Sequence, residues 1–297
     1  MFSPRLDMSD LAHRLSINIV WLYLSMVALL CIWETLAPRR QLLLSTPRRW
    51  LSHLILYFAA AVPFRLIGIG PLTLALARRD SSFGLLNRPE VPWLASFFAT
   101  LLIIDLMRYG VHRLSHSVPW LWRNHLLHHS DRDFDFTNDL RFHPLDAALQ
   151  FSGSILVVWI LAPPPVAVAV SEALAIAGGM VAHANVQLPK TVERYLRWVV
   201  ITPGLHQIHH SIDEREQGRN LGVSFVWWDR IFGTFAEVPA HGYDALRFGV
   251  KEVDAAECTR PLHMILAPFR AYKASREQSP NTIPVARSVG AQEAKLN

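Results

Sequence analysis

Five apolar runs in this chain have membrane-spanning or near-spanning length, and they restrict its fold more than any other feature. A helix rises about 1.5 Å per residue, so about 20 apolar residues cross the roughly 30 Å hydrocarbon layer of a bilayer. The chain is 51% hydrophobic and 18% charged, which indicates partial solvation by lipid. We therefore expect an all-α, polytopic integral membrane protein with about four to five transmembrane helices. The runs cover residues 17–36, 51–76, 91–107, 145–162 and 166–186.

Prolines interrupt or separate several of these runs. The second run, 51–76, contains Pro63 and Arg65, and a charge at the bilayer centre costs about 2.5–3.5 kcal/mol on insertion scales. This run is either one tilted helix that shields its arginine or a broken pair of shorter helices, and we favour one crossing. The fourth and fifth runs are separated by three consecutive prolines, 163–165, and predict a helical hairpin.

Eight of the fourteen histidines lie in three short clusters, one H-x-x-x-H and two H-x-x-H-H. Residues three and four apart share a helix face, with Cβ atoms about 5–6 Å apart, so each cluster can aim its imidazoles at one point. Two H-x-x-H-H patterns in one chain are improbable by chance. We therefore predict a polynuclear metal site. The clusters are His112 and His116; His125, His128 and His129; and His206, His209 and His210.

The predicted hairpin places these clusters on one side of the membrane. A hairpin returns the chain to the side that it left, so both H-x-x-H-H clusters end on the same face. His183 closes the last apolar run on that side as well. We expect one shared site, with His183 as its ninth ligand.

Four further polar residues are expected near the ligands. Metal-bound imidazoles usually donate a hydrogen bond from their second ring nitrogen, and Asp146 and Asp229 could accept such bonds. His143 is either a ligand or a hydrogen-bonded neighbour of one, and we favour the neighbour. Asn185 could hold a metal-bound water, or it could cap the helix end or bond the nearby backbone, and we favour the capping or backbone role.

The remaining polar residues of interest have simpler expected roles. Asp105 lies three residues before Arg108, and a local ion pair between them is favoured over a carboxylate that orients a ligand imidazole. Four isolated histidines are expected to have no metal role, namely His13, His53, His241 and His263.

The ligand type leaves three classes of function open. Imidazole suits iron, zinc and copper, and eight neutral ligands can hold two metal ions. Zinc would imply hydrolysis of a lipid through a metal-bound water, whereas iron would imply dioxygen activation and attack on an unactivated C–H bond. A membrane metal-binding or transport protein is the third class. Transport is disfavoured because the histidines gather at one face instead of following a path through several helices.

Six segments of the chain together carry a resemblance to a known family. They are HRLSH, HLLHHS, RFHPLD, HANVQLP, TPGLHQIHHS and WWDRIFGTF. On these segments the chain resembles the fatty acid hydroxylase / sterol desaturase superfamily over about residues 90–240, and is most similar to the bacterial branch nearest alkylglycerol monooxygenase and the sterol desaturases. Gln187 stands where many fatty acid 2-hydroxylases have a further histidine, which argues against that branch. Ser117 stands where some relatives have an acidic residue.

The resemblance implies a function and a set of partners. Members of this superfamily are membrane di-iron enzymes that use dioxygen and external electrons to hydroxylate or desaturate lipids. For this chain it implies two irons held by the nine histidines, with zinc as a possible substituting metal. It also implies a membrane lipid as substrate and a separate electron donor, such as a reductase or ferredoxin.

Domain organisation and location complete the expectations. We assign residues 1–89 to an N-terminal transmembrane region, 90–240 to the catalytic domain and 241–297 to a polar C-terminal tail. The net charge of +5 comes from arginines beside apolar runs and fits anionic lipid headgroups, so no nucleic acid is expected as a partner. Loop charge places the histidines on the cytoplasmic side, in a bacterial inner membrane: four arginines of the first connector would lie inside and three of the second outside.

Overall fold

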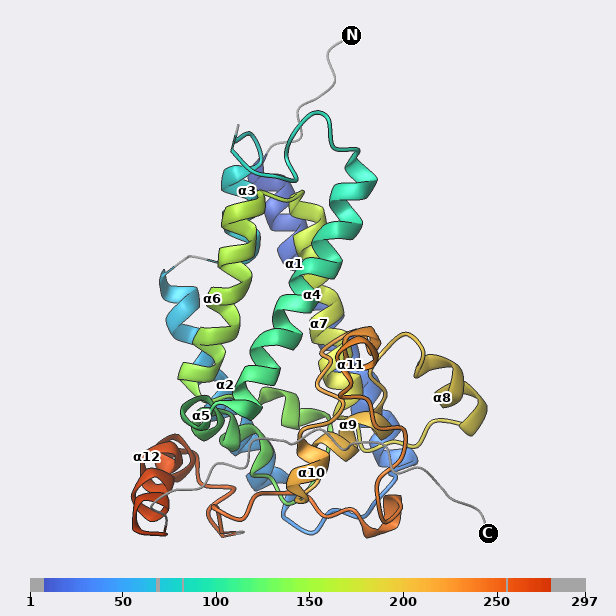
Figure 1. Ribbon diagram of the computed structural model, residues 1–297, viewed down its shortest axis with the longest axis vertical. Coiled ribbons are helices and arrows are strands. Elements are labelled where there is room, and N and C mark those ends of the chain that lie inside the picture. The colour runs from blue at the N-terminus through green and yellow to red at the C-terminus, as the bar shows by residue number, and fades with distance from the viewer. Residues whose placement is uncertain (1–7, 68–69, 82, 255, 279–297) are drawn as a thin grey trace, which may run out of the picture.

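The computed structural model describes residues 8–67, 70–81, 83–254 and 256–278, and every regular element within them is a helix. Long helices run side by side along the long axis of the molecule, and most of the short helices gather at one end (Figure 1). The prediction of an all-α fold with about four to five transmembrane helices is confirmed, because four helices have the length and hydropathy to cross a membrane. They are α1 (Met8–Leu36), α4 (Trp93–Ser117), α6 (Pro144–Leu161) and α7 (Pro165–Ala182).

The outward faces of the long helices are apolar. Trp21 on α1 is 64% exposed, Leu94 on α4 is 61% exposed and Leu156 on α6 is 56% exposed. Continuous apolar surface of this kind is rare on proteins that are surrounded by water. Lipid contact explains why these large side chains remain outside the core.

The run 51–76 forms two helices instead of the single favoured crossing. They are α2 (Thr46–Ile67) and α3 (Pro71–Arg78), and neither is among the candidate membrane spans found in the described residues. Gly70 is extended and Pro71 begins α3, where proline has no N–H to donate and cannot continue a preceding helix. The broken pair is therefore the arrangement found, whereas the side chain of Arg65 lies outside the described residues.

The predicted hairpin of α6 and α7 is confirmed. α6 ends at Leu161 and α7 begins at Pro165, and Ala162 between them adopts the left-handed conformation with φ 45°. Both helices pack against α4. The chain therefore returns to the end of the bundle from which α6 started.

Short helices form a cap at that end, and local capping residues fix several of their starts. Pro119 begins α5, the Asp135 carboxylate accepts a hydrogen bond from the N–H of Thr137 at the start of η1, and the Thr202 hydroxyl accepts one from the N–H of Leu205 at the start of α9. The cap consists of α5 (Pro119–His129), η1 (Phe136–Leu140), α8 (Lys190–Leu196), α9 (Pro203–His209), α10 (Glu214–Gln217), α11 (Trp227–Phe232), η2 (Tyr243–Ala245) and α12 (Pro261–Gln278).

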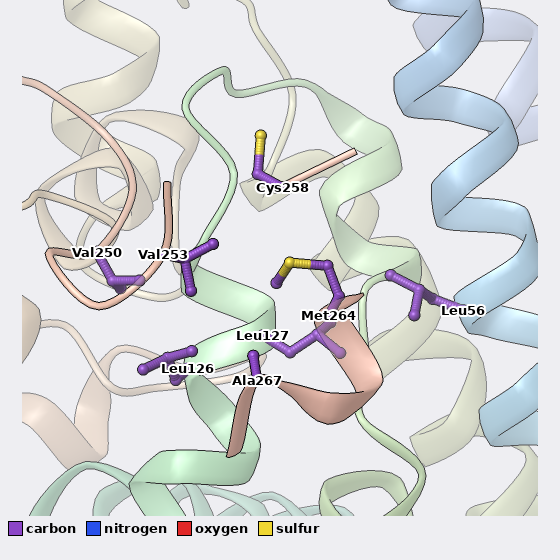
Figure 2. Close-up of a cluster of buried hydrophobic side chains, with 8 residues drawn as sticks. All are labelled: Leu56, Leu126, Leu127, Val250, Val253, Cys258, Met264 and Ala267. Atoms are coloured by element: carbon purple, nitrogen blue, oxygen red, sulfur yellow. The ribbon is translucent and has the colours of Figure 1, made fainter. Parts of the chain in front are cut away.

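Residues 241–254 and 256–278 belong to the segment that we expected to be a polar tail, and they contribute side chains to the core. Met264 on α12 and Cys258 before it pack with Leu126 and Leu127 of α5 (Figure 2). These two leucines lie between the histidines of the second cluster. Residues beyond 240 thus support the α5 turn that presents those histidines.

Candidate metal centre

The nine histidines converge at the junction of the long helices and the cap. They form two groups, and within each group the ligand atoms all lie within 4.8 Å of one another. Each group therefore has the size of a single metal coordination sphere. The first group is His112, His116, His125, His129 and His209, and the second is His128, His183, His206 and His210.

Four chain segments bring these side chains together. His112 and His116 lie one turn apart on α4, and the second cluster lies on α5. His183 is the C-cap residue of α7, and its N–H donates to the carbonyl oxygen of Gly179. α9 supplies the last cluster. Long-range packing of the hairpin against α4 is what unites them, since the segments are distant in sequence.

Backbone carbonyls orient two rings of the first group. His112 Nδ1 lies 2.8 Å from the carbonyl oxygen of Leu221, and His209 Nδ1 lies 3.0 Å from that of Arg219. A carbonyl only accepts hydrogen bonds, so Nδ1 carries the proton and Nε2 carries a lone pair. Both Nε2 atoms are buried and have no hydrogen-bond partner in the described part of the chain. Such orphaned lone pairs fit a bound metal ion.

Asp146 orients a third ring of this group. Its Oδ2 atom lies 2.9 Å from Nδ1 of His125, and both side chains are buried. The Nε2 atoms of His125, His116 and His129 also lack a hydrogen-bond partner among the described residues. The predicted contact between Asp146 and a cluster histidine is thus present, in the arrangement that tunes metal-bound imidazoles.

The second group shows the same pattern in a tighter form. His128 Nδ1 lies 3.2 Å from the carbonyl oxygen of Arg141, and His183 Nδ1 lies 2.8 Å from that of Gly179. These contacts place a proton on each Nδ1, and the two Nε2 atoms then face each other at 3.2 Å as two lone pairs. A cation that both lone pairs can bind would remove their repulsion. The residues present therefore fit a metal ion.

Burial and the neighbouring imidazoles keep these rings neutral. Burial lowers the pKa of His183 to about 4, and burial together with nearby histidines holds the pKa of His128 and of His210 well below 6.5. Histidine binds metals in its neutral form. The site is therefore prepared for metal at neutral pH without first losing protons.

The two groups adjoin each other. The rings of His129 and His210, one from each group, are stacked with centroids 4.2 Å apart. Two metal ions held by the groups would therefore share one buried centre. Because the groups contain five and four histidines, the two positions would differ in their surroundings.

Asp229 acts on the site through the backbone. Its carboxylate accepts hydrogen bonds from the N–H groups of Leu221 at 2.7 Å and Gly222 at 2.8 Å. Leu221 is the residue whose carbonyl orients His112. The expectation of a direct bond to an imidazole is therefore wrong, since Asp229 fixes the loop that makes that bond.

His143 is neither a ligand nor a hydrogen-bonded neighbour of one. Its Nδ1 atom accepts the N–H of Leu145 at 3.2 Å as the N-cap of α6, and its Nε2 atom lies 3.2 Å from the carbonyl oxygen of Ile265. The proline after it starts the helix and directs the ring to the helix end. His143 thus contributes to the start of the helix that carries Asp146.

Asn185 has the favoured backbone role. Its side chain accepts the N–H of Arg40 at 3.1 Å and donates to the carbonyl oxygen of Arg40 at 2.8 Å. Its own N–H donates to Glu34 Oε1 at 2.7 Å. Asn185 therefore ties the segment after α7 to the end of α1.

The favoured ion pair between Asp105 and Arg108 is wrong. Asp105 instead accepts hydrogen bonds from the N–H of Ser224 at 3.1 Å and from the indole of Trp228 at 2.8 Å. Arg108 pairs with Glu172 on α7 at 2.7 Å. The side chain of Asp105 therefore anchors the loop that Asp229 also fixes, and only the fold reveals this contact.

An apolar cavity of about 380 Å³ extends from the metal centre between the long helices. Histidines of both groups form part of its wall, including His112, His128 and His183. Aromatic and aliphatic side chains such as Phe151 and Ile176 form much of the remainder. A lipid chain is a ligand that such a cavity suits, because its wall is largely apolar.

Sequence reasoning missed Asp139, which lies at the junction of this cavity and the second group. Its Oδ1 atom is 3.6 Å from Nδ1 of His183, and burial raises the pKa of this carboxyl to about 7. A Cβ atom at Gly179 would overlap the carboxylate, so the glycine makes room for it. The sequence offered one signal for it, since Asp139 is an acidic residue between the second and third histidine clusters.

A second pocket, of about 310 Å³, opens on the first group from the cap. His116 and Trp122 form its inner wall, and charged side chains such as Glu214 and Lys251 form its rim. The metal centre thus borders both an apolar cavity and a hydrophilic pocket.

Comparison with known proteins identifies the family. The fatty acid hydroxylase profile matches residues 97–234, a range that includes all nine histidines. Ornithine lipid hydroxylase OlsE of Rhizobium tropici is 31% identical over 246 residues, which cover 80% of this chain and 71% of that protein. Alkylglycerol monooxygenase of Xenopus tropicalis is 30% identical over 150 residues, or 49% of this chain. The putative Delta(7)-sterol-C5(6)-desaturase 2 of Arabidopsis thaliana is 25% identical over 145 residues, or 45% of this chain.

The extent of these matches differs. The matched part covers 32% of the Xenopus monooxygenase and 46% of the Arabidopsis desaturase, whereas it covers most of the Rhizobium hydroxylase. No solved structure matches the chain. The family profile and the extent of the match to the Rhizobium protein lead to one assignment: the chain belongs to the fatty acid hydroxylase family.

Proposed function

We propose that this protein is a di-iron, dioxygen-dependent monooxygenase-type enzyme that hydroxylates or desaturates the hydrocarbon chain of a membrane lipid. One observation carries the proposal. Two adjoining groups of buried, neutral histidines form one end of an apolar cavity between membrane helices. Because imidazole ligands are neutral, the bound metals would keep their full positive charge. The cavity can place a C–H bond of the lipid beside those metals.

Two irons bound at the histidine groups would supply the chemistry, which is the activation of dioxygen for attack on an unactivated C–H bond. The protein has three tasks around that chemistry. The carbonyl oxygens of Leu221 and Gly179 and the carboxylate of Asp146 hold the rings in position. Burial excludes water from the centre. The walls of α6 and α7 orient the lipid chain.

The relatives support oxidation of a lipid. Those named above are a lipid hydroxylase, a monooxygenase and a putative desaturase. We propose a membrane lipid as the substrate here too, and a separate reductase or ferredoxin as the electron donor. We also propose that the histidine end faces the cytoplasm of a bacterial cell. The hydrophilic pocket beside His116 would then face the compartment of that donor.

Lipid profiling tests the proposal directly. Lipids are extracted from cells with the protein, without it, and with His128→Ala, and are compared by mass spectrometry. We expect one lipid class to gain one oxygen atom or lose two hydrogen atoms only with the unaltered protein. His241→Ala is the matched control, because His241 is an exposed histidine outside both groups. Identical profiles in all four strains would contradict the proposal.

Purified protein separates the proposal from a zinc-dependent lipid hydrolase and from a metal transporter. Oxidation should require iron, oxygen and a reductant. Turnover that persists without oxygen in the zinc-loaded protein would support the hydrolase. Metal uptake into vesicles that depends on His206 would support transport. Zinc content alone decides nothing, because many metals fit an imidazole site.

A further inference from the structure

The Arg108–Glu172 ion pair lies inside the membrane-spanning part of the bundle and lines the apolar cavity. Arg108 is on α4 and Glu172 is on α7, and their charged groups are 2.7 Å apart. Charged residues at this depth are costly and rare, and they commonly mark a functional path or site. The packing of α4 on α7 could be achieved by apolar side chains alone, so the pair calls for another explanation.

Both members of the pair keep hydrogen-bonding capacity that the protein does not use. Arg108 donates to the carbonyl oxygen and hydroxyl of Ser171 and to Oε1 of Glu172. Its Nε–H and the second carboxylate oxygen of Glu172 have no hydrogen bond with any residue that the structure describes. The Glu172 side chain is 28% exposed, and the cavity is the space that both side chains line. A donor and an acceptor are therefore available side by side in a largely apolar wall.

The two members of the pair lie at different distances from the histidines of their own helices. Arg108 precedes His112 by one helical turn, which is about 6 Å along the axis of α4. Glu172 precedes His183 by eleven residues, or about 16 Å along α7. Gln150 on α6 also lines the cavity, and its carboxamide likewise has no hydrogen-bond partner in the described chain. Polar groups from three helices thus line the cavity at some distance from the histidines.

We infer that Arg108, Glu172 and Gln150 form a polar subsite that binds an oxygen-bearing group of the lipid substrate, such as a hydroxyl, ester or amide. This inference rests on the proposed function and specifies its substrate class. The substrate carries a hydrogen-bonding group at a fixed number of carbon atoms from the C–H bond that is oxidised. Binding of that group at the subsite sets which carbon lies against the metals. A plain hydrocarbon would leave the buried donor and acceptor unpaired, which strongly disfavours its binding.

A double variant separates a binding role of the ion pair from a purely structural one. Arg108→Met with Glu172→Leu removes both charges together and leaves no unpaired charge in the membrane. Replacing a buried ion pair with apolar residues of similar volume is commonly neutral or stabilising. This double variant should therefore fold, whereas either single variant would leave one charge without its partner.

A binding experiment tests the subsite without turnover. Full-length protein is loaded with zinc, which is redox-inert, in detergent micelles. It is incubated with equal amounts of hexadecane and hexadecan-1-ol, and the lipids retained after gel filtration are quantified by gas chromatography. We expect the alcohol-to-alkane ratio of the double variant to fall about tenfold or more below that of the unaltered protein. Each probe partitions into the micelle to the same extent in both samples, so this partitioning cancels when the two proteins are compared. Equal ratios in two proteins of equal zinc content would overturn the inference.

A turnover experiment separates failure of the inference from failure of the proposed function. The iron-loaded proteins are given oxygen, a reductant and hexadecan-1-ol, and the position of the new hydroxyl or double bond is determined by mass spectrometry. The unaltered protein should oxidise one position, and the double variant should give a mixture at an unchanged iron content. A single shared position in both proteins would contradict the subsite. If the unaltered protein oxidises no lipid at all, the proposed function fails, and the binding result still decides whether the subsite exists.

Discussion

His125 Nδ1 and Asp146 Oδ2 are 2.9 Å apart and both buried, so a carboxylate from the first turn of α6 holds a histidine of α5. Removing that carboxylate should weaken the first metal position. We expect Asp146→Ala to lower metal affinity about 10–100-fold, and Asp146→Asn to lower it less because its amide oxygen can still accept the Nδ1–H bond. Competition with a chelator of known affinity measures the effect. Equal affinity in all three proteins would show that Asp146 has no influence on the metal.

His183 and His143 offer a matched pair of substitutions. His183 belongs to the four-histidine group, whereas His143 belongs to neither group. His183→Ala should therefore reduce bound metal from the proposed two ions per chain to about one. His143→Ala should retain both ions and lose only about 1 kcal/mol of stability, through its lost N-cap. Elemental analysis of purified protein distinguishes these results, and metal loss in His143→Ala alone would contradict the assignment of ligands.

The metal-free protein should become less stable as the pH falls. The pKa of His183 is about 4 in the folded chain, and those of His128 and His210 lie well below 6.5, whereas an unfolded chain has a histidine pKa of about 6.5. Below that pH the unfolded state binds more protons, so the free energy of unfolding decreases. The stability is fully present above about pH 6.5 and is lost progressively toward pH 4.

Thermal unfolding of metal-free protein between about pH 5 and pH 7.5 tests this dependence. The unfolding temperature should fall with acidification across that range. Bound metal should oppose the fall until the imidazoles take up protons and release it. An unfolding temperature that rises as the pH is lowered would contradict the direction of the pKa shifts.

Asp105 should support the metal centre from a distance. Its carboxylate accepts hydrogen bonds from Ser224, in the loop that contains Leu221, and from Trp228 at the start of α11. Leu221 is the hydrogen-bond partner of His112. Asp105→Ala would leave buried donors unpaired, at a cost of about 1–3 kcal/mol for each. We expect a lower unfolding temperature and weaker metal retention. Thr100→Val is a suitable comparison, because Thr100 is a buried residue of the same helix whose hydroxyl bonds only to the α4 backbone.

The hydrophilic pocket beside His116 predicts how fast a chelator removes metal. Gly218 lines this pocket, and a Cβ atom there would meet nothing within 4 Å. Gly218→Trp should therefore fill the pocket without disturbing the backbone, and should slow metal release to a water-soluble chelator. Lys251→Ala, which trims the rim, should not slow it. Equal release rates in the unaltered protein and Gly218→Trp would show that metal leaves by another route.

Local sequence patterns were enough to identify four membrane helices and the histidines, whereas the single crossing favoured for the run 51–76 was wrong. Hydropathy over about 20 residues is a local property, and the spacing of His125, His128 and His129 describes a helix face before any tertiary contact forms. The hairpin then followed from its prolines, since they stop one helix and start the next. The side chains that hold the rings were less accessible. Asp146 was anticipated, while the direct role expected for Asp229 and the ion pair expected for Asp105 were wrong, because a carboxylate bonds whichever donors the fold brings to it.

The sequence by itself determined that this chain is a helical membrane protein with nine histidines suited to metal, because helix length and residue chemistry are encoded locally. Only the tertiary structure decided how those histidines divide into groups of five and four. Adjacent residues such as His128 and His129 belong to different groups, since neighbours on a helix point about 100° apart. The tertiary structure also brought Arg108 and Glu172 together beside an apolar cavity. That contact depends on the packing of α4 against α7, across a separation in sequence that no local pattern spans.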